Sequence, residues 1–201
     1  IDQEDPNLVN DNVPARPGEV LPGIINLLPV ASRPFFPGQA VPLLMEADHW
    51  ASTIEAVREA GHGIMGIVLA DSPSSETAKP SSFNKVGTAC RIHRVQKADG
   101  KLQVLVECLA RFSIEKVLGN EAPFRARVTF HHEPIGASKG DIKAYSLAII
   151  NTIKELVPLN PLYGEELRMF LDRMGPDDPS HLADFAASLT SSNKQQLQEV
   201  L

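Results

Sequence analysis

The stretch VGTACRIHRVQKADGKLQVLVEC, residues 86–108, decides the fold class of this chain. On both sides of Asp99-Gly100, small or apolar residues alternate with polar ones, and a period of two indicates strands with one buried face. An Asp-Gly pair between two such runs is a strong signal for a tight hairpin turn. The stretch therefore predicts two antiparallel strands of a larger sheet.

Strand patterns continue before and after this hairpin. Further runs rich in β-branched and aromatic residues lie at 24–30, 41–45, 64–69, 111–117 and 124–132. Several strands joined by short turns favour a small, largely antiparallel barrel or sandwich, which we place at residues 24–134.

Two local signals refine this β-rich unit. Pro29 cannot donate a hydrogen bond to a neighbouring strand, so we expect the first strand at an edge of the sheet or ending on a bulge. One short amphipathic helix is expected after Asp48, which has an N-capping side chain, and Gly61 supplies its stop. The unit is thus predicted to hold several strands and a single helix.

The hydrophobic period changes from two to about 3.6 after Pro134, which is the clearest boundary in the chain. Apolar stripes predict an α-helical bundle over residues 135–201, so the fold class is α+β. Asp178-Pro179 predicts the start of its third helix, and Ser192 with Gln195 predicts a capping box for the fourth. Because the last stripe continues up to Leu201, we expect further protein beyond it.

The beginning of the chain is acidic. Residues 1–20 hold five Asp or Glu and one basic residue, Arg16, and have almost no apolar periodicity. Such a segment buries too little apolar surface to offset its ordering entropy. We therefore expect a flexible acidic lead-in over residues 1–23.

Charge elsewhere gives one weak signal about partners. The net charge is −6, but residues 79–133 hold ten Lys or Arg against five Asp or Glu. A local basic excess can indicate an anionic partner, although solvated strand faces carry such residues too. No apolar run approaches the roughly 18 residues of a membrane-spanning helix, so we expect a soluble, cytoplasmic protein without a membrane partner.

Motifs for catalysis are absent from the sequence. There is no G-x-x-x-x-G-K-[ST], G-x-S-x-G or H-E-x-x-H run, so neither ATP binding nor hydrolysis is expected in this chain. His131-His132 would point to opposite faces of a strand and so would not share a metal ion. Cys90 and Cys108 flank the hairpin turn, and a pair of buried thiols is favoured over a disulfide. We expect no cofactor and no metal site.

Four apolar residues are candidates for contacts with a protein partner: Phe35, Phe36, Met45 and Trp50. Thioether and aromatic side chains tolerate varied apolar partners. In a competing interpretation, these side chains fill the sheet or cover its end. The binding role requires that some of them stay exposed.

Short segments along the chain form a recognisable series. They are Leu27-Leu28-Pro29-Val30, Phe36-Pro37-Gly38, Val41-Pro42-Leu43, Val86-Gly87-Thr88-Ala89, Val104-Leu105-Val106-Glu107, Ala110-Arg111-Phe112, Leu159-Asn160-Pro161, Asp177-Asp178-Pro179 and Leu182-Ala183-Asp184. In this order and spacing they resemble the N-terminal substrate-binding domain of Lon-type ATP-dependent proteases, over residues 24–201. Ser32-Arg33-Pro34 and Trp50 depart from the usual family pattern, which bears on the choice of substrate. The acidic lead-in is longer than in typical bacterial Lon and suggests a divergent Lon subtype.

The resemblance implies a PUA-like β-barrel at 24–134 and a helical bundle at 135–201, ahead of an AAA+ ATPase and a serine peptidase in one polypeptide. Family members assemble as homo-hexamers and use this region to engage unfolded or degron-bearing proteins. It follows that this fragment would recruit substrates without catalysis. ATP and magnesium would bind only in the ATPase domain.

Two alternatives remain open at the level of sequence. A free-standing PUA-like RNA-binding protein would use the basic segment 79–133, together with stacking from Phe83, Phe112, Phe124 or Phe130. A stand-alone Lon-domain protein with a regulatory role would differ only in the sequence beyond Leu201. The protease module is favoured over RNA binding, because strand alternation would bury several of these phenylalanines.

Overall fold

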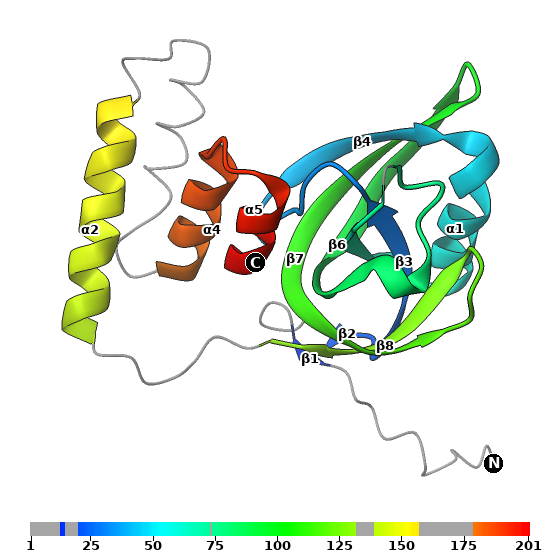
Figure 1. Ribbon diagram of the computed structural model, residues 1–201, viewed down its shortest axis with the longest axis horizontal. Helices are drawn as coiled ribbons and strands as arrows, with labels where there is room; N and C mark the ends of the chain where they lie inside the picture. The colour runs from blue at the N-terminus through cyan, green and yellow to red at the C-terminus, as the bar shows by residue number, and fades with distance from the viewer. Residues whose placement is uncertain (1–12, 15–19, 73, 132–138, 157–178) are drawn as a thin grey trace, which may run out of the picture.

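The computed structural model describes residues 13–14, 20–72, 74–131, 139–156 and 179–201 (Figure 1). Its strands are β1 (Val13–Pro14), β2 (Val20–Leu21), β3 (Ile24–Val30), β4 (Ala40–Glu46), β5 (Ile64–Ala70), β6 (Phe83–Ala98), β7 (Lys101–Leu118) and β8 (Phe124–Phe130). Its helices are α1 (Ala47–Glu59), the 3₁₀ turn η1 (Pro80–Ser82), α2 (Lys139–Leu156), α4 (Pro179–Leu189) and α5 (Lys194–Val200). Strands dominate up to Phe130, and the last three helices lie together on one side of the sheet.

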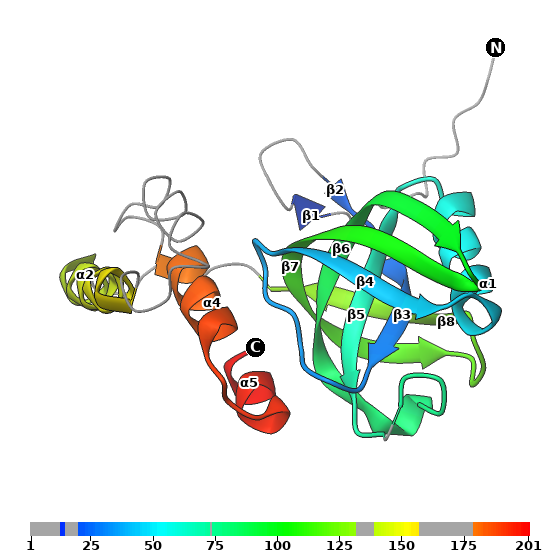
Figure 2. The ribbon, with the colours of Figure 1, turned by 90° about the horizontal axis from the view of Figure 1, so that it is seen from above.

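Strands β3 to β8 form one sheet in the order β4-β7-β6-β5-β3-β8. Because β7 also pairs with β8, the line of paired strands from β7 through β6, β5 and β3 to β8 returns to β7. The pairing of β3 with β5 is parallel, and the other pairings in this sheet are antiparallel. Among the described strands, β4 pairs only with β7 and forms the open edge (Figure 2). The prediction of a mostly β unit is confirmed.

The hairpin between β6 and β7 turns at Asp99-Gly100, as predicted. Both residues have positive φ angles, 51° and 76°, which the tight hairpin turn requires. Strand β7 then runs without a break to Leu118, so the prediction of a separate strand at 111–117 is wrong. The β6–β7 register shifts at two irregularities, and such irregularities bend a strand pair without interrupting it.

Strand β3 lies between β5 and β8, so its predicted position at the edge of the sheet is wrong. Strand β8 pairs with Ile24–Leu27, whereas β5 pairs with residues 26–30. Pro29 therefore lies beyond the part of β3 that has a neighbour on both sides. Its missing N–H interrupts no bond to β8, and this explains how an internal strand accommodates proline.

Helix α1 begins one residue before the predicted N-cap, Asp48. Glu46 occupies the N-cap position without a side-chain hydrogen bond, and Asp48 lies in the first turn, where its charge is favourable. Gly61 follows the helix with a φ of 76°, the left-handed conformation that commonly ends helices. The buried face of α1 covers the sheet core with Ala47, Trp50, Thr53, Ile54 and Val57.

The core of the closed sheet includes Phe112, whose ring is fully buried. A Cβ atom added at Gly87 would lie 2.7 Å from Phe112 Cζ and 2.6 Å from the Ile67 carbonyl oxygen, and one at Gly66 would lie 2.7 Å from the same Cζ. The two glycines therefore make room for this ring between β5 and β6. Glycine in a strand interior here reflects close packing.

The C-terminal helices contain a second, smaller cluster. Ile150 and Ile153 of α2 pack against Leu182 of α4. Helix α4 begins at Pro179, and the predicted N-cap Asp178 lies outside the described residues. The predicted helix that includes residues 167–174 also lies outside them, so a complete helical bundle stays a prediction.

Helix α5 has the predicted capping box one residue later than expected. Asn193 Oδ1 accepts from the Gln196 N–H at 2.9 Å, and Gln196 Oε1 accepts from the Asn193 N–H at 3.2 Å. The prediction of Ser192 with Gln195 is therefore wrong by one position. Asn is as good an N-cap as Ser, so the sequence contains two competing boxes, and the structure has the one at Asn193.

Within the predicted flexible lead-in, residues 1–23, the structure describes residues 13–14 and 20–23. Strands β1 and β2 pair antiparallel, with Val13 opposite Leu21. The Leu21 side chain is buried in the sheet core. The core therefore includes a residue that precedes position 24.

Candidate functional site

The structure separates the four candidate partner-binding residues. Trp50 of α1 is 3% exposed and belongs to the sheet core, so it supports the fold and offers no surface to a partner. Met45 is partly buried against the same core. The positions of both side chains agree with the competing interpretation, in which these residues fill the sheet or cover its end.

Phe35 and Phe36 lie in the connection between β3 and β4. The Phe35 carbonyl accepts from Thr88 Oγ1 at 2.6 Å, and the Phe36 N–H donates to Gln39 Oε1 at 2.8 Å. Phe35 is partly buried, and Phe36 has no exposed surface. These two side chains and those of Met45 and Trp50 do not form one exposed surface.

An apolar surface that the sequence reasoning missed lies on the outer face of β4. Leu44 is 68% exposed, and Pro42 is exposed on the same face. Pro42 lies opposite Leu105 of β7, which is 39% exposed. Met45, the predicted residue, is the neighbour of Leu44 and points to the opposite, inner face. Residues 40–45 are all apolar, so the sequence gives no alternation that would have identified Leu44.

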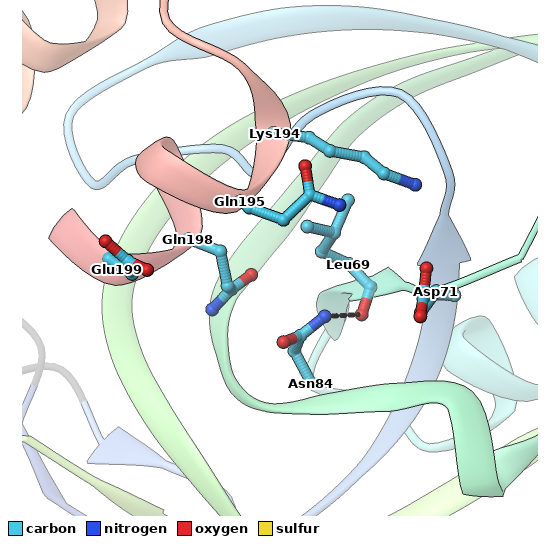
Figure 3. Close-up of a pocket in the computed structure, with 8 residues that line it drawn as sticks. Leu69, Asp71, Asn84, Lys194, Gln195, Gln198 and Glu199 are labelled. Atoms are coloured by element: carbon cyan, nitrogen blue, oxygen red, sulfur yellow. Dashed lines mark hydrogen bonds between the residues drawn. The ribbon is translucent and has the colours of Figure 1, made fainter.

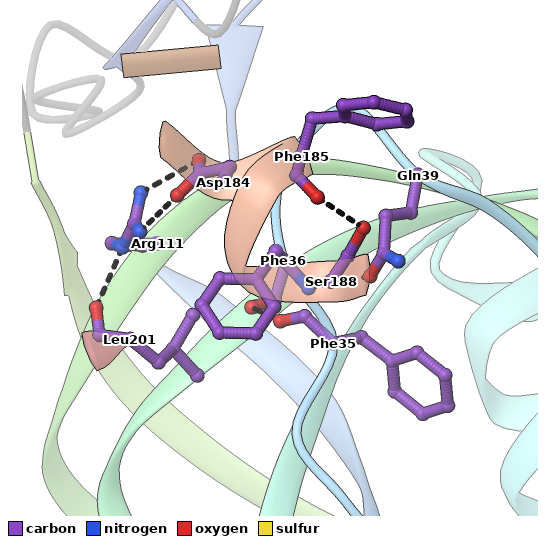
Figure 4. Close-up of polar contacts among 9 residues, drawn as sticks. Phe35, Phe36, Gln39, Arg111, Asp184, Phe185, Ser188 and Leu201 are labelled. Atoms are coloured by element: carbon purple, nitrogen blue, oxygen red, sulfur yellow. Dashed lines mark hydrogen bonds and ion pairs between the residues drawn. The ribbon is translucent and has the colours of Figure 1, made fainter. Parts of the chain in front are cut away.

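Arg111 of β7 joins the sheet to the C-terminal helices (Figure 4). Its Nη1 donates to Asp184 Oδ2 at 2.9 Å, its Nη2 donates to Asp184 Oδ1, and its Nε donates to the Leu201 carbonyl at 2.6 Å. Asp184 of α4 is 3% exposed. A planar guanidinium suits such a two-oxygen contact, so Arg111 fixes α4 and α5 against the sheet.

Three further hydrogen bonds follow the same seam. Arg33 Nη2 donates to the Ser188 carbonyl at 3.1 Å, Lys194 Nζ donates to the Ala31 carbonyl at 3.4 Å, and Gln198 Nε2 donates to the Val86 carbonyl at 3.1 Å. The β3–β4 connection and β6 are thus both tied to the helices. Polar contacts of this kind are typical of junctions between parts of one chain.

A pocket of about 240 Å³ opens at this seam (Figure 3). Asn84 Nδ2 donates to the Leu69 carbonyl at 3.0 Å on its floor, and Gln198 Oε1 is buried without a partner among the described residues. The lining residues are Leu69, Ala70, Asp71 and Asn84 from the sheet side and Lys194, Gln195, Gln198 and Glu199 from α5. The pocket has polar groups on both sides but more apolar than polar lining surface, and it belongs to the junction.

Cys90 and Cys108 are cross-strand neighbours on β6 and β7. Their sulfur atoms lie 3.3 Å apart, both residues are buried, and both thiols are free. Burial raises the pKa of the Cys90 thiol well above its usual value, and the hydrogen bond with Cys108 adds to this shift. The prediction of a buried thiol pair is confirmed, and a protonated thiol is a poor nucleophile.

No group of three His, Cys, Asp or Glu side chains that could hold a metal ion occurs in the described part of the chain. His131 Nε2 lies 2.7 Å from Ser113 Oγ, and its sequence neighbour His132 is outside the described residues. Within the same residues, no helix has the length and apolar character needed to cross a membrane.

Comparisons with known proteins agree on one family. The family model of the ATP-dependent protease La (LON) substrate-binding domain matches residues 24–201. Lon protease 2 of Hydrogenovibrio crunogenus is 44% identical over 180 residues, which cover 90% of this chain and 20% of that protein. Lon protease 1 of Syntrophotalea carbinolica is 39% identical over 187 residues, which cover 91% of this chain and 22% of that protein.

A solved structure supports the fold. The N-terminal domain of a Mycobacterium avium complex Lon protease superimposes with a TM-score of 0.68, over 88% of each chain and at 21% sequence identity. The chain spans about a fifth of the length of the curated relatives it matches. By its sequence from residue 24 to residue 201, the chain belongs to the family of Lon protease substrate-binding domains.

Proposed function

We propose that this chain recruits unfolded or degron-bearing proteins for an ATP-dependent Lon protease. The observation that carries the proposal is the match of residues 24–201 to the Lon substrate-binding domain. The exposed apolar side chains of Pro42, Leu44 and Leu105 supply a surface of the kind that binds unfolded segments. The sequence contains no motif for hydrolysis, so cleavage belongs elsewhere in the protease.

In this proposal the whole protein is a cytoplasmic homo-hexamer with an ATPase domain and a serine endopeptidase domain. ATP and magnesium belong to the ATPase domain, because this sequence has no phosphate-binding loop. The closed sheet serves as a PUA-like barrel, and residues 135–201 form the helical bundle. Several weak sites in one hexamer would raise the effective concentration of a substrate near the pore.

RNA binding receives little support from the aromatic residues of the basic segment. Phe112, Phe124 and Phe130 are buried, and Phe83 is partly buried with its ring edge-on to Phe124 at 5.2 Å. Single-stranded RNA needs exposed rings on which bases stack. We therefore take protein substrates as the ligand class.

The test removes residues 24–201 from the protease and measures degradation of a permanently unfolded protein, such as reduced and carboxymethylated α-lactalbumin. We expect degradation to fall strongly, while ATP hydrolysis and cleavage of a short reporter peptide persist as controls for assembly. Unchanged degradation of the unfolded protein, with both controls intact, would rule out the recruiting role.

A further inference from the structure

The register of β4 against β7 shows which backbone groups of β4 are already paired. The Ala47 N–H donates to the Gly100 carbonyl at 2.9 Å, and the Cys108 N–H donates to the Gln39 carbonyl at 2.8 Å. Between these bonds the register is continuous over residues 40–46. In an antiparallel ladder, hydrogen-bonded and non-hydrogen-bonded positions alternate. The odd-numbered residues of β4 therefore face β7.

The even-numbered residues direct their backbone groups away from β7, towards the open edge. Ala40 and Leu44 each present one N–H and one C=O there, and Pro42 presents its C=O alone. Strand β4 has no second neighbour among the described strands, and it forms the upper rim of the sheet in Figure 1. Such an edge is a template for an added strand.

From Ala40 to Met45 the side chains along this edge are uncharged and apolar. Pro42 and the 68%-exposed Leu44 lie on the outer face, next to the position that an added strand would occupy. From Ala40 to Met45 the strand carries no charged residue, and Glu46 is the first. Edge strands usually carry Lys or another charge that prevents pairing, and β4 carries one only at its last residue, Glu46. The edge matches an uncharged apolar segment, because a charged segment would lose hydration against Pro42 and Leu44.

We propose that the open edge of β4 binds an extended, proline-free apolar segment of an unfolded protein as an additional strand. The proposal rests on the function proposed above and names the feature of the substrate that is recognised. Backbone hydrogen bonds to Ala40 and Leu44 give affinity for many sequences, and Leu44 adds apolar contact. A protease that must accept varied unfolded chains benefits from contacts to the backbone, which all chains share.

A second copy of this chain fits the edge less well. In a symmetric β4–β4 pair, both strands would lack the backbone N–H at Pro42, so two hydrogen-bond donors would be missing. With a proline-free segment, only the donor at Pro42 of β4 is missing. The edge is seven residues long, far too short to bury the roughly 1,600 Å² of a standard stable interface. A short, weak contact suits a substrate that must be passed on.

Amide hydrogen exchange of the full chain, monitored by NMR, detects these hydrogen bonds directly. The probe is a ten-residue peptide of alternating valine and serine. We expect the Ala40 and Leu44 amides to exchange about tenfold more slowly with saturating peptide, from one added hydrogen bond each. The amides of Leu43 and Met45, which face β7, should be protected in both states and serve as internal controls.

The outcomes separate this proposal from the proposed function. If the chain binds unfolded α-lactalbumin but the peptide does not bind, or leaves Ala40 and Leu44 unprotected, the edge is not the site and recruitment stands. If it binds neither, the proposed function itself fails. Protection of both amides without peptide, rising with protein concentration, would show that the edge pairs two copies and would overturn the proposal.

A pair of variants tests the same contact from the protein side. Leu44→Pro removes an outward N–H and breaks no bond to β7, and Leu44→Ala is its matched control for the lost side chain. We expect the proline variant to bind the peptide about tenfold more weakly than the alanine variant. Equal affinities of two folded variants would overturn the proposal. Should the proline variant fail to fold, the exchange measurement on the unaltered chain decides.

Discussion

Thr53 is fully buried in α1, and its Oγ1 has no hydrogen-bond partner among the described residues. Valine has nearly the same shape and no hydroxyl group, so Thr53→Val removes a desolvated polar atom. We expect the free energy of unfolding to rise by about 1 kcal/mol, measured by chemical denaturation. Thr53→Ser keeps the hydroxyl and deletes a methyl group, so it should be less stable than the unaltered chain. A stability loss in the valine variant would show that the hydroxyl has a partner.

His62 makes the stability of the fold depend on pH. Burial lowers the pKa of this imidazole below its ordinary 6.5, and Nδ1 accepts from the Ile64 N–H at 3.0 Å, which requires an unprotonated Nδ1. Because the folded pKa is the lower one, the stabilising contribution is complete above the unfolded pKa and is lost as pH falls through the folded pKa.

Unfolding free energy measured between pH 7.5 and 5, values that bracket about 6.5, should therefore decrease towards acid. His62→Gln cannot titrate and should show a shallower decrease over the same range. Parallel curves for the two proteins would contradict a role for His62.

At the level of single residues, the sequence predicted the chemical state of side chains better than it predicted which side chains are exposed. The Cys90–Cys108 pair followed from alternation around one turn, which is local information. The exposure of Leu44 was not predicted, because a continuous apolar run hides which side chains face outward. Register against β7 decides this, and register is set by residues about 60 positions away along the chain.

Among the elements, the seam between the sheet and α4 depends on Arg111. Arg111→Met removes the guanidinium that contacts the buried Asp184 carboxylate and the Leu201 carbonyl. We expect a loss of about 3 kcal/mol in unfolding free energy, because a buried charge loses its ionic partner. Faster amide exchange in α4 and α5 than in β5 would locate the loss at the seam.

Two control variants separate charge from geometry at this seam. Arg111→Lys keeps the charge without the planar fork and should lose less than Arg111→Met. Replacing both partners, with Arg111→Met and Asp184→Leu together, should recover part of the loss. If the double variant were as unstable as the sum of the single ones, the two side chains would not act as a pair.

Elements were predicted correctly where the sequence signal is local, and the predictions were wrong where the signal is not local. The β6–β7 hairpin followed from Asp99-Gly100, and α1 followed from helical spacing within residues 47–59. The internal position of β3 could not be predicted in this way, because the sequence does not show which strands pair with β3 on either side of Pro29. The closure of the sheet through β7 and β8 is a long-range feature with no local sequence signal.

For the whole molecule, family membership came from short segments in a fixed order, and the match over residues 24–201 confirms it. The partner surface is harder to predict, because the candidates Phe36 and Trp50 fill the interior. Large apolar residues are more often buried than exposed, so a list of them is a poor guide to binding. The open edge of β4 becomes visible only once all strand pairings are known.

The most direct test of the recruiting role measures binding of the isolated chain to fluorescently labelled α-lactalbumin by anisotropy, in two forms. One form is reduced and carboxymethylated, and the other is native and calcium-bound. We expect saturable binding of the unfolded form, at least about tenfold tighter than binding of the native form. Equal affinity for both forms, or no binding of the unfolded form, would contradict the claim that this domain recruits unfolded proteins.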